Sequence, residues 1–121
     1  MNAKAEALKQ RTKTFALNVL AFRRTLPDDD QSRDIGRQLT RAATGVGANY
    51  RAACRSRSRA EFIARLGIVL EEADESAFWL EILSEARVAI EKRVYELLDE
   101  ANQLCAIFAA SSITAGGSPK R

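Results

Sequence analysis

Apolar residues recur along most of the chain at alternating intervals of three and four positions, which is the spacing of one face of an α-helix. The first helix is predicted over residues 3–25, and its seam continues to the next residue; it consists of Leu8, Thr12, Phe15, Val19, Phe22 and Leu26. Pro27 disfavours helical geometry at the residue before it, so it is predicted to end the first helix. The next residues, Asp28 to Asp30, supply candidate N-caps for a second helix.

The second predicted helix covers residues 30–53 and contains many small residues. Gly36, Gly45 and Gly47 lie inside it, although each glycine costs about 1 kcal/mol relative to alanine in a helix interior. Neighbouring alanines favour the interpretation that other helices approach closely here. Asn49 lies near the inward face and is predicted to hydrogen-bond to an adjacent helix. The inward seam is Ile35, Leu39, Ala42, Val46 and Ala53.

Two further helices follow. Ser58 and Glu61 form a capping box, which predicts that a third helix begins near Arg59 and continues to about Arg87. Its main seam is Phe62, Leu66, Val69, Ala73, Ser76, Leu80 and Leu83. A second apolar strip lies beside it and consists of Ile63, Leu70 and Ala77, widened by Phe78 and Trp79. The two strips together present more apolar surface than one four-helix core uses, which favours self-association.

The connection to the fourth helix falls within residues 86–90 and carries no clear turn signal. The fourth helix fades near Ser111, and residues 114–121 are predicted to be a disordered tail. Four helices of similar length with short connections predict an all-α, antiparallel up-down-up-down four-helix bundle, with one domain over residues 1–113. The fourth seam is Ile90, Val94, Leu97, Ala101, Leu104 and Phe108.

Composition disfavours several kinds of active site. The 121-residue chain has no histidine, which removes the commonest general base and zinc ligand. Cys54 and Cys105 match no metal-ligand spacing and are expected to be free thiols in a reducing cytoplasm. The acidic run from Glu71 to Glu75 is interpreted as a solvated or partner-facing strip rather than a metal site. We expect no enzyme activity, no cofactor and no metal.

The sequence shows no secretory signal and no membrane-spanning stretch. The N-terminal residues are charged throughout and lack the apolar core of a secretory signal. No stretch approaches the roughly 18 apolar residues that a membrane-spanning helix needs. A cytoplasmic protein with no membrane association is therefore expected.

Charge is distributed unevenly along the chain. Through Arg65 there are 14 lysines and arginines against 6 acidic residues, whereas the remainder has 5 against 10. Clustered arginines could contact the phosphates of RNA or DNA, remain solvated, or meet an acidic helix of another subunit. Only Tyr50 is an aromatic neighbour, which favours backbone contacts over base stacking. The candidate nucleic-acid-binding residues are Arg33, Arg37, Arg41, Arg51, Arg55, Arg57 and Arg59.

Short motifs in a fixed order carry a family resemblance over about residues 15–108. They are Leu26-Pro27, the run from Gln38 to Ala43 with Asn49, Arg57-Ser58 with Glu61-Phe62, and Glu71-Glu72-Ala73 with Trp79-Leu80-Glu81. With these motifs the chain resembles the four helix bundle protein family, which includes proteins encoded in intervening sequences of bacterial 23S ribosomal RNA genes. It is also similar to the accessory variability protein of diversity-generating retroelements.

The resemblance implies a bundle that assembles into a ring, commonly a homopentamer. Retroelement relatives use a basic surface to engage nucleic acid and a reverse transcriptase, and no catalytic residues are available to carry over. This chain departs from the pattern after Asn49, where many members have an acidic residue followed by glycine and this chain has Tyr50-Arg51-Ala52-Ala53.

Two functional hypotheses follow. The first is a non-enzymatic, oligomeric protein that binds nucleic acid, RNA in preference to DNA, through its basic surface. The second is a protein-interaction scaffold or adaptor, whose basic surface meets an acidic face of a neighbouring subunit or of a partner protein.

Overall fold

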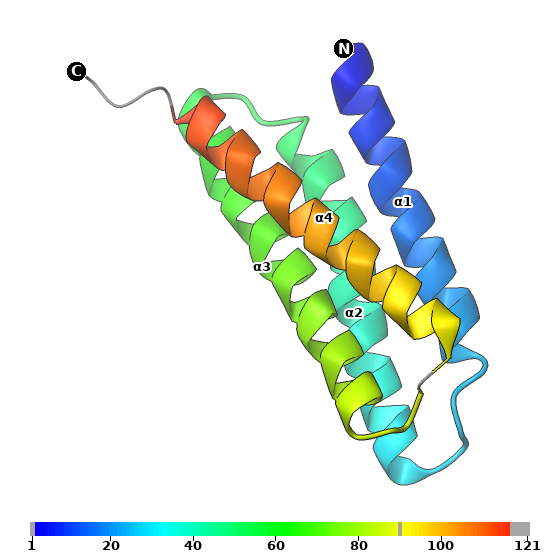
Figure 1. Ribbon diagram of the computed structural model, residues 1–121. Helices are drawn as coiled ribbons and strands as arrows, with labels where there is room; N and C mark the ends of the chain where they lie inside the picture. The colour runs from blue at the N-terminus through cyan, green and yellow to red at the C-terminus, as the bar shows by residue number, and fades with distance from the viewer. Residues whose placement is uncertain (1, 90, 117–121) are drawn as a thin grey trace.

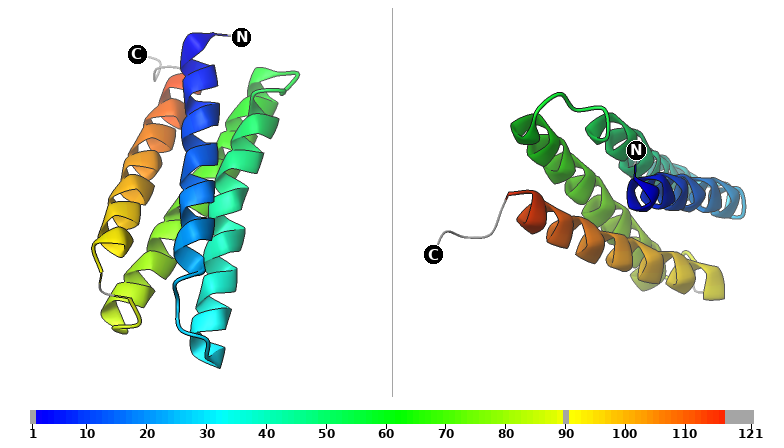
Figure 2. Two further views of the ribbon diagram at one scale, coloured as in Figure 1. Left: turned by 90° about the vertical axis from the view of Figure 1, so that its right-hand side faces the viewer. Right: turned by 90° about the horizontal axis from the view of Figure 1, so that it is seen from above.

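The computed structural model describes residues 2–89 and 91–116, and these form a bundle of four long helices (Figure 1). In chain order the helices are α1 (Ala3–Arg23), α2 (Asp30–Ala53), α3 (Arg59–Glu85) and α4 (Lys92–Ala115). α2 packs against α1 and α3, and α4 packs against α3 and, less extensively, α1. α1 and α3 therefore lie diagonally across the bundle (Figure 2). The predicted all-α up-down bundle is confirmed.

The start of α2 lies at its predicted position because Asp29 caps it. The Ser32 backbone N–H donates to Oδ1 of Asp29 at 2.8 Å. α1 ends at Arg23, slightly before the predicted end, because the chain leaves the helix in a tight turn. In this turn the backbone N–H of Thr25 donates to the carbonyl of Phe22.

The start of α3 confirms the predicted cap and shows how it is built. Oγ of Ser58 accepts the backbone N–H of Glu61 at 3.0 Å. The Glu61 carboxylate reaches one residue beyond the cap and accepts the backbone N–H of Arg57 at 2.9 Å. The α3 end of the α2–α3 turn is thus fixed by two polar contacts, which gives Arg57 and Arg59 a defined backbone.

The α3–α4 turn depends on an arginine in a left-handed conformation. Arg87 has φ = 61°, a geometry in which glycine is usual. The backbone N–H of Val88 donates to the carbonyl of Leu83 at 3.0 Å, which closes the end of α3. α3 ends at Glu85 and α4 begins at Lys92. The connection falls where it was predicted, but α3 ends two residues before the predicted Arg87, and no glycine at the turn marked that end.

Parts of the predicted fourth helix and of the predicted tail lie outside the described residues. Ile90, which the pattern assigned to the inward seam, is one of these residues, and so are residues 117–121 of the predicted tail. α4 continues to Ala115, so Thr114 and Ala115 of that tail segment are helical.

The core consists mainly of the predicted seams, together with Ala43, Tyr50, Ala77 and Ala89, which those seams did not include. Its largest fully buried side chains include Phe15 and Phe22 of α1 and Phe108 of α4. Two buried hydroxyls lie among them without cost, because each bonds to a carbonyl of its own helix: Thr12 to Leu8 at 2.9 Å and Ser76 to Glu72 at 2.9 Å. The seam pattern thus sets the inward face of every helix.

The glycines of α2 lie where neighbouring helices approach, as predicted. A Cβ at Gly47 would lie 3.5 Å from the backbone oxygen of Thr12 in α1, and one at Gly45 would lie 2.9 Å from Cδ of Glu72 in α3. The prediction for Asn49 was wrong. Its side-chain amide donates to the carbonyl of Gly45 at 2.8 Å, because that carbonyl of its own helix is only one turn away.

α1 and α4 leave an open seam between them. Toward the N-terminus of α1 it holds a groove of about 910 Å³ lined by Leu8, Phe62 and Ile107, among others. A smaller cleft of about 550 Å³ lies further along, beside Phe15 and Leu97. Among the described residues, no helix is long and apolar enough to cross a membrane.

Candidate nucleic-acid interface

Five of the seven candidate arginines share the solvent-exposed side of α2. Arg33, Arg37, Arg41 and Arg51 are all exposed, while Leu39, Val46 and other seam residues on the opposite side are fully buried. Arg55 follows one turn after Arg51 in the same register, directly beyond the helix. At 1.5 Å per residue, this row extends about 33 Å. The helical spacing therefore places the predicted residues in a line.

The first part of this row is largely neutralised. Arg33 forms ion pairs with Asp28 and Asp30, and Arg37 forms one with Asp34. Each aspartate comes from the same short stretch as its arginine, so the pairs form whenever α2 forms. Arg33 and Arg37 consequently add little net positive charge to the surface.

Arg41 faces the acidic helix α3. Burial raises the pKa of the Glu72 carboxyl, and repulsion from Glu75 adds to this effect, while the positive charge of Arg41 opposes it. Glu72 reaches α2 because Gly45 has no side chain to displace it. The middle of the row is thus a contact zone between a basic and an acidic helix.

The basic corner, defined as Arg51, Arg55 and Arg57, differs from the rest of the row. All three side chains are exposed, and none makes an ion pair within the described part of the chain. Arg51 and Arg55 also lie at the C-terminal end of α2, where the helix dipole stabilises positive charge. The corner therefore carries positive charge that no acidic side chain among the described residues neutralises.

Arg59 has a structural contact instead. Its Nε donates to the backbone oxygen of Ala115 at 2.6 Å, so it caps the C-terminal end of α4. Arg65, one and a half turns later, pairs with Glu61 at 3.3 Å. Of the seven predicted site residues, four make no ion pair or guanidinium hydrogen bond with the residues that the structure describes: Arg41, Arg51, Arg55 and Arg57.

Lys4 was missed by sequence reasoning. It lines the larger α1–α4 groove, and Cys54 at the end of α2 lines the same groove. No local motif marks it. The antiparallel arrangement places the start of α1 beside the end of α2, and this relationship was available only from the predicted topology.

The aromatic side chain nearest the corner does not offer a base-stacking surface. Tyr50 is only 5% exposed, and its ring packs against Phe108 with centroids 5.2 Å apart. Burial raises the pKa of the Tyr50 hydroxyl. An anion that met this corner would contact guanidinium groups, which suits the phosphates of a nucleic-acid backbone.

Metal-binding and nucleophilic groups do not converge near the corner. No three histidine, cysteine, aspartate or glutamate side chains are placed to hold a metal ion in residues 2–89 and 91–116. Cys54 and Cys105 are free and half-buried. Burial raises the pKa of the Cys105 thiol, which makes it a weak nucleophile at neutral pH.

The fold and this surface define an all-α, four-helix protein with an exposed basic corner at one end of the bundle. Residues 5–110 match the model of the 23S rRNA-intervening sequence protein family, and the chain belongs to that family. This confirms the resemblance to proteins of 23S ribosomal RNA intervening sequences.

A solved structure supports the same assignment. The chain is similar to a protein of unknown function from the S23 ribosomal protein family of Bacteroides thetaiotaomicron, with 26% sequence identity and a TM-score of 0.82. The similarity covers 90% of this chain and 97% of that one. No curated protein matches the chain.

Proposed function

We propose that this chain is a non-enzymatic protein that binds nucleic acid, RNA in preference to DNA, through the basic corner and Arg41. The observation that carries the proposal is the difference in pairing along one row of arginines. Arg33 and Arg37 are neutralised by aspartates, whereas Arg51, Arg55 and Arg57 are exposed without an ion pair in the described residues. The preference for RNA is supported by the family description alone.

Phosphate contact explains this arrangement better than recognition of bases. A guanidinium group forms charge-assisted, two-point hydrogen bonds with phosphate oxygens. Because Tyr50 is buried against Phe108, the corner lacks the stacking surface that single-stranded binders use. Binding through phosphates alone is expected to be sensitive to salt and to tolerate many sequences.

A salt titration tests the proposal. Binding of fluorescent RNA and DNA of the same sequence is measured by anisotropy at several salt concentrations, for the wild type and for Arg51→Ala/Arg55→Ala/Arg57→Ala. Loss of three phosphate contacts should reduce the slope of log K against log salt by about 2 to 3. The wild type should bind the RNA more tightly than the DNA.

The matched control is Arg33→Ala/Arg37→Ala, which removes exposed arginines that are already paired. It should leave the slope nearly unchanged. Equal effects of the two variants, or weak binding by the wild type that does not strengthen as salt falls, would show that the basic corner is not a nucleic-acid site.

A second candidate function is an oligomeric protein-interaction scaffold, with a homopentameric ring as the form that the resemblance implies. The supporting observation is that α3 exposes Glu71, Asp74 and Glu75 to solvent. Charge reversal at Arg55 and Arg57 separates the candidates. Dissociation of the oligomer favours the scaffold, whereas an intact oligomer that has lost RNA binding favours the first proposal. Arg59 is unsuitable for this test because it caps α4.

A further inference from the structure

The diagonal helices α1 and α3 carry opposite charges. Most of α1 has only basic charged residues, and most of α3 has only acidic ones. Residues 7–27, which include most of α1, have five basic residues and no acidic one. Residues 66–86, which include most of α3, have six acidic residues and no basic one. Since α1 and α3 are diagonal and do not pack together, this complementarity is not used within one subunit.

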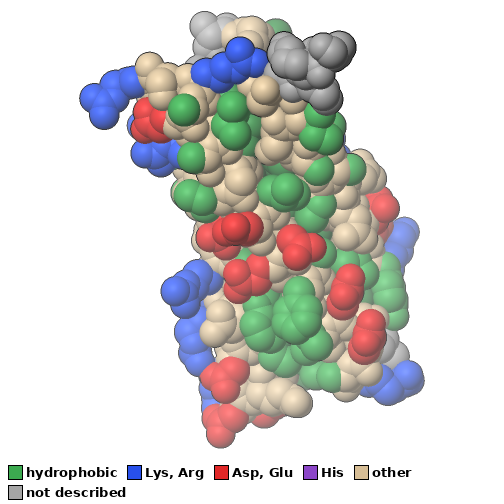
Figure 3. All heavy atoms as spheres, turned by 90° about the vertical axis from the view of Figure 1, so that its left-hand side faces the viewer, with side chains coloured by type: hydrophobic (Ala, Val, Ile, Leu, Met, Phe, Trp, Pro, Cys, Tyr) green, Lys and Arg blue, Asp and Glu red, His purple; other side chains and the backbone are tan. Residues whose placement is uncertain are grey.

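The outward face of α3 combines the acidic residues with exposed apolar ones. Phe78 is 49% exposed and packs edge-to-face against the half-buried Trp79, with ring centroids 5.0 Å apart. Oε2 of Glu75 accepts the indole N–H of Trp79 at 3.2 Å, which holds the carboxylate beside the aromatic pair. The view onto α3 in Figure 3 shows an apolar cluster with acidic side chains around it.

The order of residues along this face is acidic, apolar, acidic. Glu71 and Glu75 precede Phe78, and Ile82 and Glu85 follow it, at the three- and four-residue intervals of one helix face. None of these three glutamates forms an ion pair among the described residues. The distance from Glu75 to Glu85 along the helix is about 15 Å.

The outward face of α1 has the same order with the opposite charge: basic, apolar, basic. Lys13 and Arg24 are exposed, and between them lie Leu17, which is 55% exposed, and the half-buried Leu20. Lys13 and Arg24 also lack ion pairs in the described part of the chain. The stretch from Lys13 to Arg24 is about 16 Å long, close to the distance of about 15 Å between Glu75 and Glu85.

We propose that the α3 face, defined as Glu71, Glu75, Phe78, Ile82 and Glu85, binds the α1 face of a second copy of this chain, defined as Lys13, Leu17, Leu20 and Arg24. Phe78 packs against Leu17 and Leu20, and the charged residues pair on either side. This interface deepens the self-association put forward above and does not involve the basic corner, which stays available for nucleic acid.

The geometry makes the contact head-to-tail. α1 and α3 are diagonal in the bundle (Figure 2), and each face lies on the side of its helix opposite the buried seam, so one subunit can bind a neighbour on each side. Such heterologous contacts repeat from copy to copy and close into a ring when the rotation between subunits allows it. A closed assembly gains stability from two contacts per subunit, whereas an isolated pair of subunits has only one.

A mixing experiment tests the direction of the contact. Leu17→Asp damages the α1 face and Phe78→Asp damages the α3 face, so each variant alone should be a monomer of 13.4 kDa by light scattering or sedimentation equilibrium. Mixed in equal amounts, they should form a complex of two subunits and nothing larger, because one intact face remains on each variant. The absence of this complex at protein concentrations up to about 1 mM would overturn the head-to-tail contact.

Charge exchange provides a second, independent measurement. Lys13→Glu/Arg24→Glu should weaken assembly at least about tenfold, because like charges then face each other. Adding Glu75→Lys/Glu85→Lys to the same chain should restore assembly, since the charges are again complementary. A rescued variant must be folded, which removes misfolding as an explanation.

The control is Ile113→Asp, which replaces a 69% exposed apolar residue of α4 outside both faces and should leave assembly unchanged. A wild type that stays monomeric overturns self-association itself. A wild type that assembles but is insensitive to Leu17→Asp and Phe78→Asp, or equally sensitive to Ile113→Asp, overturns only the proposed interface.

Discussion

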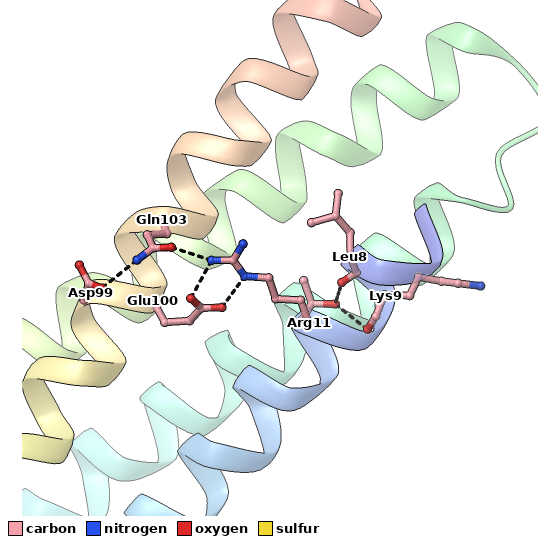
Figure 4. A network of polar contacts seen from close by, with 7 residues as sticks. Leu8, Lys9, Arg11, Asp99, Glu100 and Gln103 are labelled. Carbon is pink, nitrogen blue, oxygen red and sulfur yellow. Dashed lines mark hydrogen bonds and ion pairs between the residues drawn. The ribbon is translucent and has the colours of Figure 1, made fainter. Parts of the chain in front are cut away.

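Arg11 of α1 and Glu100 of α4 form a two-point ion pair across the α1–α4 seam (Figure 4). Of the adjacent helix pairs in the bundle, α1 and α4 pack together least extensively. Nε of Arg11 donates to Oε2 of Glu100 at 2.7 Å, and Nη2 donates to Oε1 at 2.8 Å. The same Nη2 reaches Oε1 of Gln103 at 2.8 Å. Hydrogen bonding to Glu100 raises the pKa of Arg11. Arg11 lines both grooves, so the pair divides the open seam in two.

Removing this pair is expected to destabilise the protein modestly. Because the side chains of Arg11 and Glu100 are 36% and 28% exposed, Glu100→Gln should lower the free energy of unfolding by about 0.5 to 1 kcal/mol in chemical denaturation. The control is Glu96→Gln, which affects a more exposed pair with Lys92 at 3.7 Å and should cost less than about 0.5 kcal/mol. Equal losses would show that the two-point geometry adds nothing.

Two helix glycines should respond differently to alanine. A Cβ at Gly67 has no neighbour within 4 Å, so Gly67→Ala should raise the free energy of unfolding by about 0.5 to 1 kcal/mol. Gly45→Ala should gain less, because its Cβ would lie 2.9 Å from Cδ of Glu72. Glu72→Ala in the Gly45→Ala background should recover the difference. Thermal and denaturant unfolding of the wild type, Gly45→Ala, Glu72→Ala and the double variant measures the coupling, and additive effects would contradict close packing at Gly45.

The left-handed residue of the α3–α4 turn offers a stabilising change. Arg87 has φ = 61°, where a side chain is strained and glycine is not. Arg87→Gly should therefore raise the free energy of unfolding by about 1 kcal/mol. Arg87→Ala is the control for loss of the charged side chain and should not stabilise. If both variants behave alike, the backbone conformation is not the cause.

The N-cap of α2 makes stability depend on pH. The Ser32 backbone N–H, followed by the Ser32 hydroxyl and the charge of Arg33, holds the pKa of the Asp29 carboxyl below its usual value of 3.8. A lowered folded-state pKa stabilises the protein above the unfolded-state pKa, and this contribution is lost as the pH falls through the folded-state value. Melting temperatures measured from about pH 7 to about pH 2 should fall with acid in the wild type.

Asp29→Asn keeps a side-chain oxygen that can cap α2 at every pH. Its melting temperature should therefore fall less steeply in acid than that of the wild type, while the two proteins differ little at neutral pH. Parallel curves for the two proteins would mean that Asp29 does not contribute to acid unfolding.

The sequence by itself determined the helices and their inward faces. The three- and four-residue spacing of apolar positions led to the correct bundle, since burying those seams is the main source of stability for helices of this length. Asp29 and the Ser58–Glu61 pair fixed two helix starts, because capping acts over three residues. Helix ends such as Glu85 were less predictable, since an arginine stands where the turn geometry favours glycine.

Only the tertiary structure decided which charges remain available. The row of arginines was visible in the sequence, but the capping contact between Arg59 and Ala115 joins residues far apart in the chain. The same holds for the charges of the basic α1 and the acidic α3, which do not meet within one subunit because these helices do not pack together. Local spacing sets which face a residue occupies, whereas packing sets which partner it meets.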